Sequence, residues 1–335
     1  MKPLRFIYGG FGFQKGYNFV LYAITAGALL GFVLARVQYL DIDGIFREES
    51  IPGEYYWYQS GFRRVGIIMH LVGVLFGGMF AFLQFTPIIR HKALWFHRIS
   101  GYLAILLLLA GNAGVYMIID HSIGGVPAMR LFFGILGAMT TIGLLLAYVN
   151  IKRLQIDQHR AWMIRTWAWA GCIISLRLIL DAATEVAHRY DITLHTPIRC
   201  DEIFFMYLNN AGIPNEQNPT GKIYEQCGDN ASTNPLEILI STEAGGPESA
   251  AALLRPMFLM SAYLAITIHA LLAELYLWLT PAEHYRLRIV SYQKQVEKGL
   301  RKRGSPKEAG LGSTRFGDAP EWWSLLREDQ AAPTA

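Results

Sequence analysis

Two His-Arg pairs stand at the start of long apolar stretches. "FHRISG" contains His97 and Arg98, and "QHRAWM" contains His159 and Arg160. Two neutral imidazoles on facing helices can hold a haem iron, with cationic side chains near the propionates. If the two stretches form parallel helices, the histidines lie at the same depth. We therefore expect His97 and His159 to be the axial ligands of a haem b.

A second histidine pair belongs to the opposite side of the membrane. His70 has no partner at its own depth inside an apolar stretch, and His121 is the nearest candidate. Together these pairs suggest a transmembrane electron-transfer protein or reductase that takes electrons from a small-molecule donor.

Ionisable groups inside apolar stretches also support a different chemistry. Asp181, Glu274 and His70 are costly in lipid, and such residues are functional candidates. Burial can raise a carboxyl pKa enough for the group to act as an acid at neutral pH. The alternative is therefore a cofactor-free membrane enzyme acting on a lipophilic substrate. In a third interpretation, a transporter or scaffold, the same residues conduct protons or hold helices together.

Several polar side chains have structural interpretations. Arg177 and Asp181 are spaced i, i+4 and could form an ion pair, which lowers the cost of burying either one. Asn112 is most simply an interhelical hydrogen-bond donor. Gln84 shares a helix face with His70 and two glycines, and this face suits close approach of either another helix or a flat cofactor.

The composition predicts that these residues lie in a membrane. Hydrophobic residues make up 53% of the 335 residues and charged residues only 17%, against about 25% charged in soluble domains. Six apolar runs approach the roughly 20 residues that a helix needs to cross the hydrocarbon layer. They are Asn18–Val37, Val65–Phe85, Ile99–Ile119, Arg130–Asn150, Ala161–Ala183 and Arg255–Leu279. Because lipid satisfies no backbone hydrogen bonds, we expect an all-α polytopic bundle.

Lys and Arg predict the orientation, since short basic loops stay in the cytoplasm. They gather in the lead, the second and fourth connections and the tail, which places both termini in the cytoplasm of an endoplasmic reticulum or plasma membrane. The predicted parts are a cytoplasmic lead (1–17), a five-helix membrane core (18–183), a lumenal or extracellular loop (184–253), a sixth spanning helix (254–280) and a basic, partly disordered tail (281–335).

The long loop carries two signs of an oxidising compartment. Cys200 and Cys227 could form a disulfide there, and Asn230 begins the glycosylation sequon "NAS". We expect an irregular cap with one short helix near 201–211. Before the second span, the aromatic residues of "EYYWY" (54–58) form either an interfacial belt or a lid over a binding site.

The sequence lacks the motifs of common soluble enzymes. It has no phosphate-binding glycine loop, no HExxH zinc motif and no nucleophile elbow between a strand and a helix. Contact with anionic lipid explains the basic tail better than contact with nucleic acid does. The expected partners are therefore the bilayer and a small molecule.

The histidine motifs resemble a known family. His70, Gln84, Arg90, "HRISG" at His97–Gly101 and "HRAWMIR" at His159–Arg165 are similar to a family of predicted multi-pass membrane proteins, the domain of unknown function numbered twenty-three-oh-six. The resemblance covers about 64–181, and the cysteine-bearing loop looks like the fungal branch. It implies a multi-helix membrane fold and no particular reaction. More distantly, histidines on successive helices are similar to cytochrome b561-type reductases, although here they do not form two depth-matched pairs.

Overall fold

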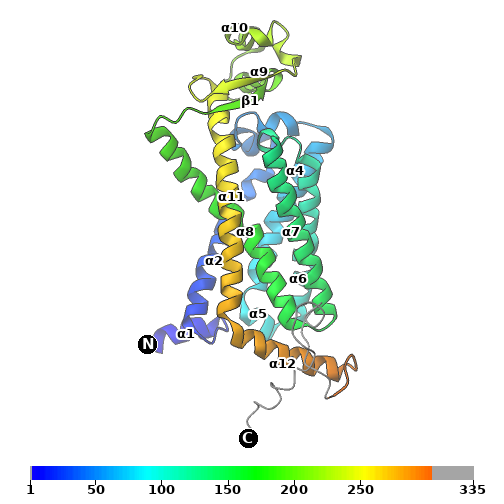
Figure 1. The fold of residues 1–335 in the computed structure, drawn as a ribbon. Helices are drawn as coiled ribbons and strands as arrows, with labels where there is room; N and C mark the ends of the chain where they lie inside the picture. Colours follow the sequence, from blue (N-terminus) through cyan, green and yellow to red (C-terminus); the bar gives the residue numbers. More distant parts are fainter. Residues whose placement is uncertain (1, 304–335) are drawn as a thin grey trace, which may run out of the picture. The chain divides into compact units, whose positions relative to one another are not determined.

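The computed structural model describes residues 2–303 (Figure 1). The predicted disordered end of the tail, beyond residue 303, lies outside the described residues. The chain divides into two compact units. Unit 1 comprises Met1–Ala138 and Gly171–Thr267, and unit 2 comprises Met139–Ala170 and Ile268–Ala335.

The elements are mostly helical, as predicted. The long helices are α2 (Gly16–Arg36), α4 (Gly61–Gln84), α6 (Leu94–Ile118), α7 (Pro127–Lys152), α8 (Ile156–Arg189), α11 (Pro247–Leu279) and α12 (Pro281–Glu297). The short ones are α1 (Lys2–Gly10), α3 (Arg47–Glu49), α5 (Pro87–Lys92), α9 (Cys200–Asn209) and α10 (Thr220–Ile223). Single turns are η1 (Val37–Leu40), η2 (Ile42–Phe46), η3 (Glu54–Tyr58), η4 (Ser122–Gly124), η5 (Asn215–Gln217), η6 (Glu225–Cys227) and η7 (Ala231–Thr233), and the strands are β1 (His195–Arg199) and β2 (Glu237–Ser241). The all-α polytopic fold class is confirmed.

Five helices of the described chain are long and apolar enough to cross a membrane. They are α2 with the turn after it (Gly16–Leu40), α4, α6, α7 and α11. The predicted fifth span forms part of α8, a helix of 34 residues that is not among the five. This helix carries Arg165, Arg177 and Asp181 within the predicted span, so the prediction of six spans depends on it.

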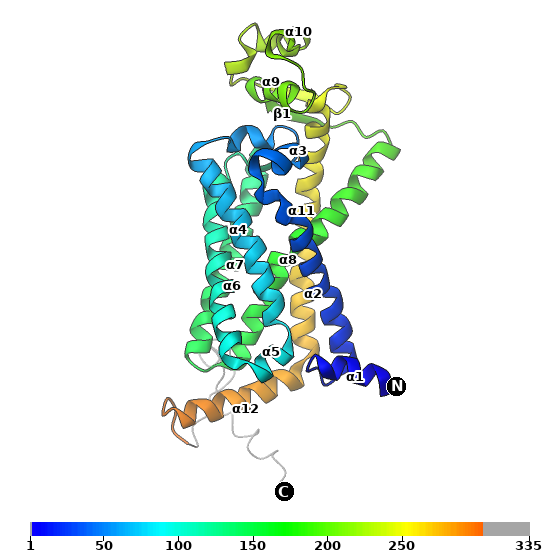
Figure 2. The same cartoon turned by 180° about the vertical axis from the view of Figure 1, so that it is seen from behind.

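Glycines let α4 and α6 pack at backbone distance in unit 1. A Cβ on Gly73 would lie 2.5 Å from the backbone nitrogen of Gly111, and one on Gly114 would lie 2.5 Å from the carbonyl oxygen of Gly66. Real Cβ atoms do not approach so closely, so side chains are excluded at these crossings. The glycine face of the second predicted span therefore packs against a helix and not against a flat cofactor. Figure 2 shows α2 beside α4, where Val33 packs against Gly78.

The loop after α8 contains more regular structure than predicted. Strands β1 and β2 pair antiparallel, with His195 opposite Ser241 and Arg199 opposite Glu237. Cys200 and Cys227 are joined by a disulfide across 27 positions. The predicted short helix is α9, which begins at Cys200. We call this region of unit 1 the cap (190–246). The prediction of an irregular cap is wrong, because alternate residues of each five-residue strand are buried.

Unit 2 has polar contacts of its own. On α12, Ser291 Oγ donates to Asp157 Oδ1 at 2.9 Å, and Gln295 Nε2 donates to the carbonyl of Arg153 at 2.8 Å. Arg165 and Glu274 form a two-contact ion pair at 2.6 and 2.8 Å. The basic helix after the last long span is therefore fixed to the turn between α7 and α8.

Candidate functional site

The aromatic turn η3 is buried in unit 1. Tyr58 is fully buried and Tyr55 nearly so, both packed with Phe46, Ile67 and Ile118. Gly53 precedes the turn with φ of 86°, which lets the chain reverse sharply. Because these rings lie inside the protein, the belt interpretation is wrong for Tyr55 and Tyr58, and η3 forms part of the covering of a polar site.

Glu54 is the central carboxylate of this site. Its Oε1 accepts a hydrogen bond from Tyr58 Oη at 2.7 Å, and its Oε2 accepts one from the backbone N–H of Ile123 at 2.9 Å. Tyr58 Oη is also 3.0 Å from Ser122 Oγ. Burial raises the pKa of Glu54 to about 7, against the opposing effect of these hydrogen bonds. At neutral pH this carboxyl is therefore less fully ionised than an exposed one.

The loop that binds Glu54 has an unusual backbone. Ile123 has φ of 52° and is followed by Gly124 and Gly125, also at positive φ. A β-branched residue in this region is a true outlier and costs energy. The hydrogen bond from the Ile123 N–H to Glu54 compensates part of that cost. This strained turn connects α6 to α7 and lies directly after His121.

A second buried carboxylate faces the same region from the cap. Glu202 on α9 accepts a hydrogen bond from Arg255 Nη2 on α11, and both side chains are 4% exposed. Burial raises the pKa of Glu202, and Arg255 opposes that shift. Arg255 and Glu202 also act electrostatically on Glu54. One guanidinium therefore opposes the raised pKa of both buried carboxyls, while Glu202 adds to the raised pKa of Glu54.

His121 lies at the edge of this group, parallel to Trp57. The two ring centroids are 3.6 Å apart with an interplanar angle of 5°. His121 Nε2 is 3.2 Å from Asp120 Oδ2, which also accepts from Arg63 Nη2 at 2.8 Å. Burial lowers the pKa of His121 to about 4, and the hydrogen bond from Arg63 lowers the pKa of Asp120. At neutral pH the imidazole is neutral and the carboxylate charged.

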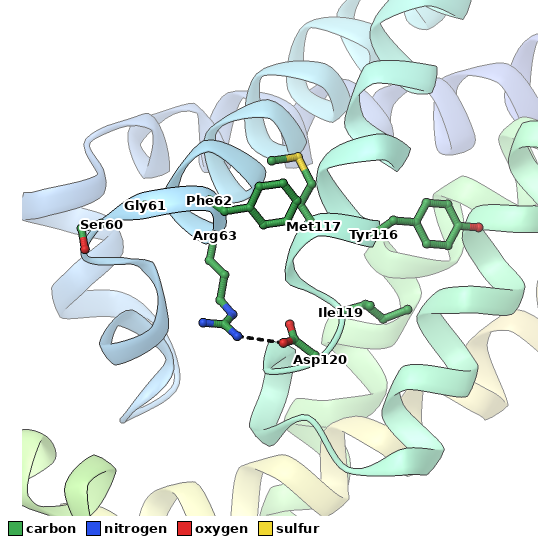
Figure 3. Close-up of a pocket in the computed structure, with 8 residues that line it drawn as sticks. All are labelled: Ser60, Gly61, Phe62, Arg63, Tyr116, Met117, Ile119 and Asp120. Atoms are coloured by element: carbon green, nitrogen blue, oxygen red, sulfur yellow. Dashed lines mark hydrogen bonds and ion pairs between the residues drawn. The ribbon is translucent and has the colours of Figure 1, made fainter. Parts of the chain in front are cut away.

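A pocket of about 430 Å³ opens beside this ion pair. Its walls come from the start of α4 and the end of α6, and Figure 3 shows Arg63 and Asp120 joined across it. The lining residues are Ser60, Gly61, Phe62, Arg63, Tyr116, Met117, Ile119 and Asp120. Its volume suits a small molecule, and one wall is charged while Phe62 and Met117 are apolar. We call the pocket and the side chains behind it the Glu54 site, comprising Glu54, Tyr58, Arg63, Asp120, His121, Glu202 and Arg255.

The structure does not bring the predicted haem ligands together within one unit. His97 lies on α6 in unit 1 and His159 on α8 in unit 2, so the pair stays a prediction. His159 Nδ1 is 2.9 Å from the carbonyl oxygen of Ala147. In ligating histidines a bond of this kind fixes the ring and turns the other nitrogen to the metal. Arg98 is exposed, and Arg160 Nη2 lies 3.3 Å from Thr280 Oγ1.

The second predicted histidine pair does not fit a haem. His70 Nδ1 lies 3.3 Å from the carbonyl oxygen of Gly111, on the face where α4 and α6 touch at backbone distance. The His121 ring stacks on Trp57, and its Nε2 contacts Asp120. Both imidazoles therefore lie against protein. Within residues 2–303, no group of three or more His, Cys, Asp or Glu side chains is placed to hold a metal ion.

The predicted catalytic carboxylates are not assembled into a site. Asp181 is exposed on α8 and forms no ion pair with Arg177 among the described residues, because Arg177 lies over the Phe258 ring at 5.1 Å instead. Glu274 is held by Arg165 in unit 2. The prediction of a stabilising Arg177–Asp181 pair is therefore wrong.

Two predicted structural amides bond between helices. Asn112 Nδ2 donates to the carbonyl oxygen of Gly137 on α7 at 3.4 Å. Gln84 Nε2 donates to the carbonyl of His97 at 2.9 Å and to Ser100 Oγ at 2.6 Å, which ties α4 to α6.

Sequence reasoning missed most of the Glu54 site. In the sequence Glu54 stands in an aromatic stretch and Glu202 is one acidic residue of a long loop. A signal existed in Arg255, a charge at the very start of the last apolar run. Such a residue needs a carboxylate partner, and the preceding loop is rich in acidic residues.

Comparison with known proteins supports the membrane family. A family described as "Predicted membrane protein (DUF2306)" matches residues 67–196, which confirms the predicted resemblance over that part of the chain. The match includes Asp120 and His121 but not Glu54. The likeness to cytochrome b561-type reductases stays a prediction.

One curated relative is "Ava biosynthesis cluster protein G" of Aspergillus versicolor. It is 29% identical over 176 residues, which cover 45% of this chain and 52% of that protein. The chain thus spans about half the length of the curated relative it matches. No solved structure matches the chain. The chain is therefore an integral membrane protein in contact with the lipid bilayer.

Proposed function

We propose that this membrane protein, whose residues 67–196 match a family of predicted membrane proteins, is an enzyme that acts on a lipophilic small molecule by acid/base chemistry. The main support for this proposal is the Glu54 site. It combines an open pocket with a cation, an ionised carboxylate, a neutral imidazole and a buried carboxyl that titrates near neutral pH. Groups whose surroundings push their pKa values apart in this way suit separate acid and base roles.

The side chains have distinct roles in this proposal. Arg63 and Asp120 line the pocket and bind a polar group of the substrate, while Phe62 and Met117 contact its apolar part. His121 does not line the pocket but contacts Asp120, which does; oriented by Asp120 and Trp57 and neutral at pH 7, it accepts a proton passed on through Asp120. A pKa near 4 makes it a weak base, so the step requires a substrate proton that is already acidic.

Glu54 supplies or stores a proton behind the pocket. Tyr58 donates a hydrogen bond to Glu54 and is hydrogen-bonded to Ser122, which connects Glu54 to the residue next to His121. Glu54 is a positioning and proton-holding residue, since it does not line the pocket. Loss of its proton above pH 7 should therefore slow turnover.

The curated relative supports a small molecule as the substrate class. That relative carries the name of a biosynthesis cluster protein, and a small-molecule substrate fits that name. The pocket opens at the end of membrane-crossing helices, where a lipophilic intermediate partitions.

Replacement of the gene in its source organism by variants tests this function. We expect Asp120→Asn and Glu54→Gln to abolish one lipophilic metabolite and to accumulate its precursor, measured by liquid chromatography with mass spectrometry. Glu216→Gln, on an exposed cap turn, serves as the control and should leave the profile unchanged. Protein level and membrane location are checked in parallel. Unchanged metabolites in both site variants, at normal protein level, would exclude acid/base chemistry at this site.

A haem b protein is the second candidate, supported by the orientation of His159 toward Ala147. In this case His159 would be an axial ligand of the iron, as the sequence predicts, and the haem would supply electron transfer. A reduced-minus-oxidised absorption spectrum of purified protein tests it. We expect sharp b-type bands that are lost in His159→Ala and kept in His121→Ala; a flat spectrum after expression with haem supplied rejects this candidate.

A further inference from the structure

The lead before α2 is fixed at one end of the helices of unit 1. Helix α1 is followed by a turn at Gly12, whose φ of 86° suits a glycine. The carbonyl oxygen of Phe11 accepts a hydrogen bond at 3.1 Å from the backbone N–H of Ile88, on α5. A Cβ on Gly12 would lie 3.0 Å from that same nitrogen. Because α5 directly follows α4, α1 lies level with the ends of α2 and α4 (Figure 1).

Helix α1 exposes two large apolar side chains. Phe6 is 85% exposed and Ile7 48%, and at 100° per residue the midpoint between them lies about 150° from Arg5. Tyr8 is on the covered side, since a Cβ on Gly16 would lie 3.5 Å from its ring. A helix of nine residues is marginal in water by itself. A surface that covers Phe6 and Ile7 would therefore also stabilise α1.

The same end of unit 1 is basic. Arg5, Lys15 and Lys92 are exposed there. The segments 1–40 and 61–119, which include α1, α2, α4, α5 and α6, contain no Asp or Glu. This end therefore carries a positive potential that attracts an anionic surface.

A lipid bilayer fits both the apolar side chains and the charge. Helix α2 is long and apolar enough to cross a membrane, and only 11% of its apolar window is buried. Its first turns expose Tyr17, Val20 and Leu21, so exposed apolar side chains continue from α1 into the span. At the end of a span, acyl chains meet charged headgroups, and an amphipathic helix with cations on its polar face is stable in that layer.

We propose that α1 is an interfacial helix, with Phe6 and Ile7 inserted among acyl chains and with Arg5, Lys15 and Lys92 in contact with anionic lipid headgroups. This surface is at the end of α4, whereas the Glu54 site is at its start. It does not rest on the proposed acid/base function. It agrees with the predicted cytoplasmic lead, because the cytoplasmic leaflet is the anionic one.

A fluorescent label at position 7 tests the insertion of α1 in the full chain. Ile7→Cys is labelled with the environment-sensitive fluorophore NBD, since Cys172 is buried and the other two cysteines form the disulfide. In nanodiscs of phosphatidylcholine with phosphatidylglycerol, we expect blue-shifted emission and quenching by lipids that carry a doxyl group on the acyl chain. Glu216→Cys, on an exposed cap turn, is the matched control and should show aqueous emission. Aqueous emission from position 7 as well would overturn the insertion.

Native mass spectrometry of the retained lipids tests the charge preference. We expect the original chain to retain phosphatidylglycerol over phosphatidylcholine. Arg5→Gln and Lys15→Gln should each reduce this preference roughly fivefold, which corresponds to about 1 kcal/mol per basic residue near an anionic surface. Arg189→Gln, at the exposed end of α8, should leave it unchanged. Equal retention of both lipids by the original chain, or an unchanged preference in both variants, overturns the anionic partner; cross-linking of two chains through Ile7→Cys would assign the face to a second copy and overturn the proposal.

Discussion

Glu54→Gln should change how the stability of this protein depends on pH. The pKa of Glu54 rises from 4.5 in an exposed chain to about 7 in the fold. Between these values the folded chain holds more protons than the unfolded chain. Stability is therefore highest below about pH 4.5 with respect to this group, and it falls as pH rises to about 7. At about 1.4 kcal/mol per pKa unit, the loss comes to roughly 3 kcal/mol.

The glutamine side chain has no such titration. It keeps one oxygen to accept from Tyr58 or from the Ile123 N–H, but its amide group then faces one of these donors. We expect the variant to be less stable than the original chain at pH 5 and to lose less stability by pH 8. Glu202 remains, and its raised pKa leaves a residual slope in both proteins. The difference between the two proteins therefore isolates Glu54.

The assay is reversible unfolding of the purified protein in mixed micelles, with the unfolding free energy measured between pH 5 and 8.5. Glu225→Gln, an exposed carboxylate in the cap, is the control and should keep the original pH dependence. A Glu54→Gln variant with the same slope as the original chain would refute the reasoning, because Glu54 would then be ionised in the fold at pH 5.

Three other changes test the packing and the cap. Gly73→Ala should destabilise the chain by about 1–3 kcal/mol, because the added carbon meets the backbone of Gly111; Gly31→Ala, which meets nothing within 4 Å, should be near neutral in the same unfolding assay. Cys227→Ser should cost about 2–4 kcal/mol and make the cap sensitive to protease at lower denaturant concentration, whereas an unchanged digestion profile would show that the disulfide adds nothing. Asn230→Gln should remove an endoglycosidase-sensitive gel shift from protein made in a eukaryotic host, since Asn230 is exposed beside the disulfide; absence of that shift in the original chain would place the cap on the other side of the membrane or leave the sequon unused.

Apolar length was sufficient to predict the membrane helices. Each predicted run lies largely within one long helix, because a 20-residue apolar segment has few alternatives in lipid. The cap strands were missed because each has only five residues, and the pairing of Thr196 with Ile240 depends on residues far along the chain. Periodicity within one segment carries no information about such a partner.

The candidate site was hidden for the same reason. Glu54 and Ile123 are 69 positions apart, and Glu202 and Arg255 are 53 apart. Residue types alone favoured histidines, which stand out in apolar runs, over carboxylates in connecting segments. His121 was identified as a candidate, but its stacking on Trp57 gives it a role that no local pattern indicates.

The arrangement of the cap sets an order of events during synthesis. Both strands and both bonded cysteines lie between His195 and Ser241, so the ribosome completes them before it starts α11. The cap can therefore fold as a preformed piece while the chain is still growing. Glu202 then lacks its ion-pair partner until Arg255 has been synthesised. The ion pair between the cap and α11 therefore forms only when α11 has been inserted. A chain that stops short of Arg255 should form the disulfide but lack this ion pair.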